Sequence, residues 1–86
     1  MSITKVTPSI AVTVEADINA AKMAEAVKIL LASSYITSLA FTSGGITCTL
    51  TLSGGNVSVT NATGTTEIAS SNHAGIASAV VAYLDL

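Results

Sequence analysis

The first regular pattern along the chain is an alternation of apolar and polar residues that begins after Pro8. Over residues 9–15, Ile10, Val12 and Val14 share one side, and the residues between them share the other. A period of two is typical of a half-buried β-strand. Proline is tolerated at the start of a strand, so Pro8 fits this assignment. We therefore predict a strand at 9–15.

The pattern then changes to the period of a helix. Asp17 is a good N-cap residue, and helix-forming residues continue to Ala32. At about 100° per residue, one face collects apolar residues. These are Ala20, Met23, Ala24, Val27, Leu30 and Leu31. Ile18 and Ile29 fall on the polar side, where we interpret them as surface residues; the alternative is a second contact face.

Short segments with a period of two follow, separated by turns rich in Gly and Asn. We expect strands at 35–42 and 46–52, a shorter one beginning at Val57, and a fifth, optional strand at 65–69. The segment 46–52 is the clearest, because every second residue from Ile46 to Leu52 is apolar and Thr47, Thr49 and Thr51 alternate with them.

A second helical segment closes the chain. Ser70, Ser71 and Asn72 are N-cap candidates for a helix that ends near Leu84. The resulting order, β-α-β-β-β-(β)-α, predicts an α+β fold with a mainly antiparallel sheet of four to five strands and two helices on one face. A length of 86 residues, without a linker, indicates a single domain at 1–86.

Charge is scarce and unevenly placed. Charged residues make up 9% of the chain, against about 25% in ordinary domains. The cations are Lys5, Lys22 and Lys28, Arg is absent, and the formal net charge is -2. Beyond Ile29 the only formal charges are Glu67 and Asp85. Binding to nucleic acid or anionic membrane requires clustered cations, so we expect neither partner.

We expect neither a membrane-spanning helix nor a signal peptide in this sequence. The longest apolar run, 79–84, is far shorter than the ~18 residues of a membrane-spanning helix. The N-terminus lacks the apolar core of a signal peptide. Cys48 is the sole cysteine, so no intramolecular disulfide forms. We expect a soluble protein in the cytoplasm or within an assembled particle.

Residues that could carry out catalysis are few. His73 is the only histidine, and no Gly-x-Ser-x-Gly pattern accompanies it. Cys48 lies on the inward side of its predicted strand, without a neighbouring cation to stabilise a thiolate. Glu15 and Asp17 flank the junction between strand and helix rather than a cleft. The sequence therefore predicts no enzyme, no catalytic residue, no cofactor and no metal site.

One segment is a candidate for binding a small ligand. Ser70, Ser71, Asn72 and His73 precede the free N–H groups of the last helix, a place that suits a small anion or a ligand phosphate. Capping alone is the favoured interpretation. A protein that sequesters a small ligand or nucleotide signal as an oligomer, using this segment and Tyr35 or Tyr83, is the alternative function.

Two features indicate packing against protein. Thr47, Thr49 and Thr51 give the central strand an uncharged outer side, which is either solvated or covered by a partner. The last helix is apolar nearly all round, and its second face is built from small residues. These residues are Ala74, Gly75, Ser78 and Ala82, with Val81 beside them. Either the first helix or a second copy covers this face.

Together these observations favour a non-catalytic structural or assembly protein. It either self-associates or decorates a larger protein lattice, as a small virion component does. The expected partner is protein, above all a second copy of the chain.

Overall fold

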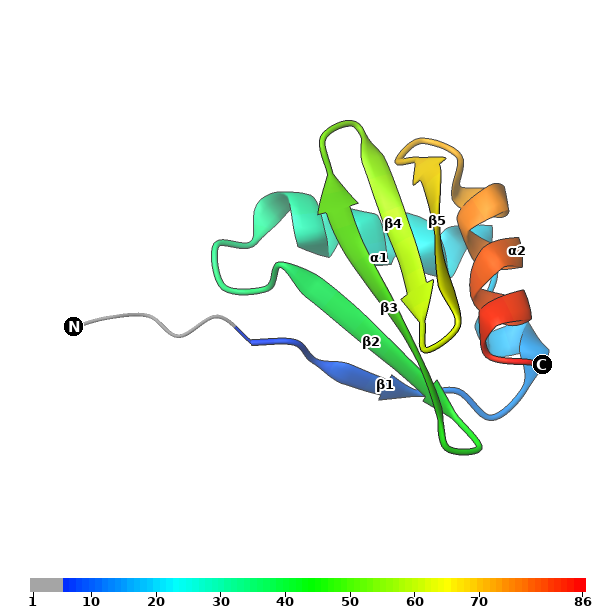
Figure 1. Ribbon diagram of the computed structural model, residues 1–86. Coiled ribbons are helices and arrows are strands. Elements are labelled where there is room, and N and C mark those ends of the chain that lie inside the picture. Colours follow the sequence, from blue (N-terminus) through cyan, green and yellow to red (C-terminus); the bar gives the residue numbers. More distant parts are fainter. Residues whose placement is uncertain (1–5) are drawn as a thin grey trace.

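The computed structural model describes residues 6–86. Residues 1–5 lie outside the described part; they include Lys5 and the N-terminal residues in which we predicted no signal peptide. Five strands form one open sheet in the order β1-β2-β3-β4-β5 (Figure 1). The strands are β1 (Ser9–Ala11), β2 (Ser38–Ser43), β3 (Ile46–Ser53), β4 (Asn56–Asn61) and β5 (Gly64–Ala69). The helices are α1 (Ala20–Ala32), α2 (His73–Tyr83) and the short 3-10 helix η1 (Glu15–Asp17).

The sheet is mixed. β1 pairs parallel to β2, whereas β2–β3, β3–β4 and β4–β5 are antiparallel hairpins. The α+β class and the fifth strand are confirmed, but the predicted antiparallel character holds only for the hairpins. The reason is the path of the chain: α1 carries it back across the sheet, so β2 starts at the same end as β1.

Turn chemistry matches the hairpins that the sequence predicts. Gly44 and Gly45 join β2 to β3 with φ angles of 56° and 84°. Two consecutive residues with positive φ are the mark of a type I′ turn, whose twist fits a tight hairpin. Any residue with a Cβ would be strained at both positions.

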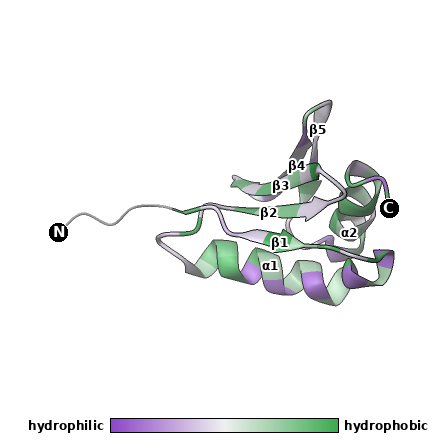
Figure 2. Cartoon of the chain, turned by 90° about the horizontal axis from the view of Figure 1, so that it is seen from below, coloured by the Kyte–Doolittle hydropathy of each residue, from purple (hydrophilic) through white to green (hydrophobic). Residues whose placement is uncertain are grey.

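Both helices cover one face of the sheet (Figure 2). α1 packs against β2 and β3, α2 packs against β4 and β5, and the two helices contact each other. Leu50 on β3, Val57 and Val59 on β4, and Met23 on α1 are fully buried between these layers. The alternating apolar residues of the strands therefore face the helices. No helix in the described part of the chain is long and apolar enough to cross a membrane.

The junction between β1 and α1 differs from the prediction. β1 ends at Ala11, and the predicted cap residue Asp17 lies in η1 instead of capping α1. Its Oδ2 accepts hydrogen bonds from the Thr13 N–H and hydroxyl, both at 3.1 Å. The N-cap of α1 is Asn19, whose Oδ1 accepts from the Lys22 N–H at 3.0 Å. The Thr13 and Val14 N–H groups bond to Asp17 instead of to a neighbouring strand, so β1 ends at Ala11 and not at Glu15.

The buried face of α1 is rotated from the predicted one. Met23, Ala26, Val27 and Leu30 are its buried residues. Leu31, predicted to be buried, is 67% exposed, and Ala20 is exposed. Ile18, predicted to lie at the surface, is only 6% exposed, whereas Ile29 is 42% exposed as expected. Ala26, which the predicted face omits, is 5% exposed.

Candidate interaction surfaces

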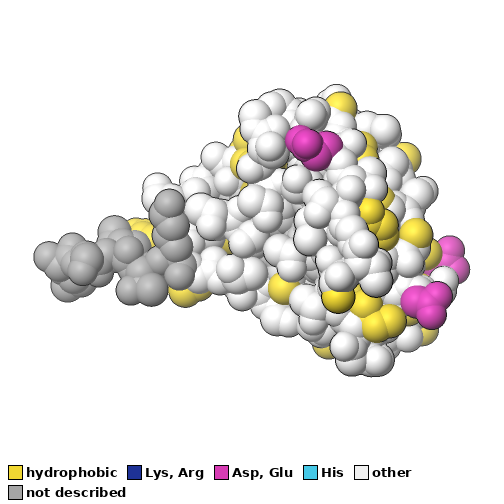
Figure 3. All heavy atoms as spheres, in the orientation of Figure 1, with side chains coloured by type: hydrophobic (Ala, Val, Ile, Leu, Met, Phe, Trp, Pro, Cys, Tyr) yellow, Lys and Arg dark blue, Asp and Glu magenta, His cyan; other side chains and the backbone are white. Residues whose placement is uncertain are grey.

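The face of the sheet opposite the helices is open and nearly uncharged. Figure 3 views the molecule in the orientation of Figure 1, and the surface seen there contains no Lys, Arg or His side chain. Residues paired across strands share a face of the sheet. One such row crosses all five strands through Ser9, Ala40, Thr49, Thr60 and Thr65. Small side chains therefore extend from one edge to the other.

The predicted threonines lie on this open face. Thr47 and Thr51 are exposed, and Thr49 is half-buried between its neighbours. A second row of paired residues runs from Thr51 through Ser58 to Glu67. Glu67 is the one charged residue that the strand register places on this side. We refer to this surface, formed by the outward residues of β1 to β5, as the open sheet face. Whether a partner covers it stays a prediction.

The small-residue face of α2 is also exposed. Ala74, Ser78 and Ala82 are exposed, and Gly75 and Val81 at its sides are half-buried. The buried side of α2 consists of Ile76, Ala77 and Val80. The first helix contacts α2 but leaves Ala74, Ser78 and Ala82 uncovered. This answers one of the alternatives, since α1 does not fill this face.

The proposed ligand segment forms the start of α2. Asn72 is the N-cap, and its Oδ1 accepts a hydrogen bond from the Gly75 N–H at 3.1 Å. Ser70 and His73 are half-buried, and Ser71 is exposed. The structure thus brings these residues together, with the Asn72 oxygen already used in capping.

The tyrosines do not join this segment. Tyr83 lies at the other end of α2, about 15 Å from His73 at the usual helical rise. Its hydroxyl forms a hydrogen bond with the Thr66 hydroxyl at 2.6 Å. Tyr35 belongs to the loop between α1 and β2. That loop lies on the opposite side of the molecule from α2 (Figure 1). Within one copy of the chain, the residues of the ligand hypothesis therefore do not converge on one site.

Cys48 lies in the core, where burial raises the pKa of its thiol to about 11. Neutral thiols are poor nucleophiles and poor metal ligands. The pKa of Asp17, in contrast, is lowered. The cause is the hydrogen bonds that its carboxylate accepts from the Thr13 and Val14 N–H groups and from the Thr13 hydroxyl. Within residues 6–86, no three His, Cys, Asp or Glu side chains gather as a metal site would require.

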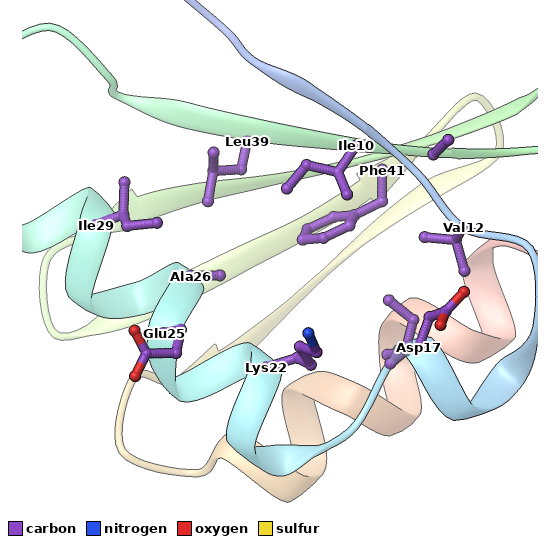
Figure 4. Close-up of a pocket in the computed structure, with 11 residues that line it drawn as sticks. Ile10, Val12, Asp17, Lys22, Glu25, Ala26, Ile29, Leu39 and Phe41 are labelled. Carbon is purple, nitrogen blue, oxygen red and sulfur yellow. The ribbon is translucent and has the colours of Figure 1, made fainter.

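The sequence did not predict a groove between β1 and α1, shown in Figure 4. Its volume is about 350 Å³. The apolar lining includes Ile10, Ile18, Ala26, Ile29, Leu39 and Phe41, and the charged lining is Asp17, Lys22 and Glu25. We call this feature the β1–α1 groove. Ile10 and Ile29 remain 43% and 42% exposed beside it.

A signal for this groove was present in the sequence. Ile18 and Ile29 lie at the Lys22 side of the helical pattern, which was the basis for considering a second contact face. Predicting the groove itself requires the position of β1 relative to α1, and periodicity does not supply that. Comparisons with protein-family models, with curated protein sequences and with solved structures found no match to this chain.

Proposed function

We propose that this chain is a non-catalytic structural or assembly protein. It self-associates, and its open sheet face packs against other protein, either further copies or a larger lattice such as that of a virion. The observation that carries this proposal is the nearly uncharged open sheet face, with Glu67 as its charged residue.

The energetics of burial support this function. Covering a surface of Lys or Glu costs up to about 2 kcal/mol of side-chain entropy for each residue, and Ser, Thr and Ala lose far less. Charged groups also lose hydration when a partner covers them. The open sheet face avoids both costs over most of its area. A net charge of -2 over 86 residues adds little mutual repulsion between copies.

The alternative function, sequestration of a small ligand or nucleotide signal, has less support. Its residues lie at separate places, and Asn72 already uses its side-chain oxygen within the helix cap. Arginine, which suits phosphate ligands, is absent from the chain.

A lysine placed in the centre of the open sheet face tests the proposal. Thr49→Lys is expected to reduce assembly at least about tenfold, because association would bury an unpaired charge. Ala20→Lys, at an exposed position on the side of α1 turned away from Lys22 and Glu25, is the matched control and should leave assembly unchanged. Light scattering after size-exclusion chromatography measures both. Equal masses for the wild type and Thr49→Lys would remove the open sheet face from the proposal.

A further inference from the structure

The outer edge of β1 has backbone groups available for another strand. Toward β2, the Pro8 carbonyl accepts from the Ala40 N–H and the Val12 N–H donates to the Thr42 carbonyl, both at 2.8 Å. Alternate residues of a strand direct these groups to opposite edges, so Ser9 and Ala11 direct theirs outward. Pro8 lacks an N–H, but its position faces β2. The outer edge is therefore not blocked by this proline.

Exposed apolar surface gathers beside that edge. Ile10 points from β1 toward the β1–α1 groove, and Ile29 lies on its α1 side (Figure 4). Val6, which precedes β1 and pairs with Ile36, is also an exposed apolar residue. The other free edge of the described sheet, β5, contributes no large exposed hydrophobic residue. An added strand would thus bury more apolar area at β1 than at β5.

The groove side of α1 is complementary to itself. The exposed residues on this side are Lys22, Glu25 and Ile29, spaced by three and four positions. An antiparallel copy presents the same residue types in reverse order. Lys22 then faces Glu25 of the second copy. A foreign partner would need to supply this pattern, whereas a second copy of the chain already has it.

We propose that the β1 edge and the β1–α1 groove form a twofold interface between two copies of this chain. β1 pairs antiparallel with β1 of the second copy, centred on Ile10, so that the two sheets become one continuous sheet. The two α1 helices lie antiparallel below the seam, and each Lys22 forms an ion pair with Glu25 of the other copy. The interface rests on the proposed self-association but has its own tests.

A charge exchange tests the contact between the α1 helices. Lys22→Glu is expected to weaken the dimer at least about tenfold, because it places like charges across the axis. Lys22→Glu combined with Glu25→Lys exchanges the signs and should restore the dimer. Lys28→Glu is the matched control: it has the same charge change and the same distance of three residues from Glu25, but it lies outside the groove lining. Sedimentation equilibrium measures the dissociation constants.

Two proline variants test the pairing of the edges. Ala11→Pro removes an outward N–H from β1. On β5, the Ser70 N–H donates to the Gly55 carbonyl, so Ala69 directs its N–H outward and Ala69→Pro is the matched control. We expect Ala11→Pro to weaken the dimer at least about tenfold and Ala69→Pro to leave it unchanged. Thermal unfolding followed by circular dichroism shows whether each variant is folded. If Ala11→Pro is not folded, the charge exchange between Lys22 and Glu25 decides whether the interface forms.

The outcomes separate this interface from the proposed function. A wild-type chain that stays monomeric overturns both. A wild-type oligomer that resists Lys22→Glu, or that the double variant fails to restore, overturns the interface alone. An oligomer sensitive to Ala69→Pro and not to Ala11→Pro moves the seam to β5 and also overturns it.

Discussion

Leu50→Ala is expected to lower the free energy of unfolding by about 3 kcal/mol. Leu50 lies on the central strand β3 and is 0% exposed. It pairs with Leu39 on one side and Val59 on the other, and both of these are buried. Truncation removes apolar burial and leaves a cavity that the surrounding strands cannot fill. For a domain of this size, such a loss is a large part of its stability.

Leu31→Ala is the matched control, because Leu31 is 67% exposed on α1. Its expected effect on the free energy of unfolding is below about 0.5 kcal/mol. Urea denaturation of both variants at one fixed protein concentration measures the difference. Equal losses would mean that the core does not lie between the sheet and the helices as described.

Alkylation of Cys48 in the folded protein is expected to be at least about 100-fold slower at pH 8 than in the unfolded chain. The thiolate is the reactive form, and raising the pKa from 9.0 to about 11 reduces its population by about that factor. Burial also blocks the reagent. Iodoacetamide labelling followed by mass spectrometry, with and without urea, measures both rates. Rapid labelling of the folded protein would place this cysteine outside the core.

The raised pKa of Cys48 also contributes to the pH dependence of the free energy of unfolding. Burial raises the pKa of Cys48, so the folded state holds the thiol proton more tightly than the unfolded state. Its contribution to stability is complete below pH 9 and falls as the pH rises toward 11. Cys48→Ala removes this component, and the difference between the pH profiles of the two proteins isolates it. A difference that does not change between pH 8 and 11 would contradict this assignment.

Periodicity predicted the hairpin strands well because the two faces of the sheet differ strongly there, whereas the strand predicted at 9–15 is shorter. In β3, Cys48 and Leu50 are buried, whereas Thr47 and Thr51 are exposed. The same alternation identifies a face but not the direction of a neighbouring strand. The parallel pairing of β1 with β2 follows instead from the return of the chain through α1.

Errors in the prediction of α1 have a common cause. Its alanines fit any face, so sequence alone did not determine how the helix is rotated against the sheet. The structure places Ala26 inward and Leu31 outward, and it buries Ile18. The β1–α1 groove depends on this rotation, so the pattern marked Ile18 and Ile29 beside Lys22 but did not predict the groove itself.

The candidate surfaces were partly accessible to prediction. Thr47, Thr49 and Thr51 lie on the open sheet face, and Ala74, Ser78 and Ala82 are exposed on α2. Their exposure follows from side-chain size and period, both of which sequence supplies. The self-complementary charges at Lys22 and Glu25 became meaningful only when the structure placed them beside a free edge.

The central claim is that the chain associates with itself, and the mass of the wild-type protein in solution tests it most directly. Sedimentation equilibrium at neutral pH and physiological salt, from micromolar to millimolar protein, gives that mass. We expect a mass that rises with concentration from 8.5 kDa to at least twice that value. A constant mass of 8.5 kDa over the whole range would contradict it.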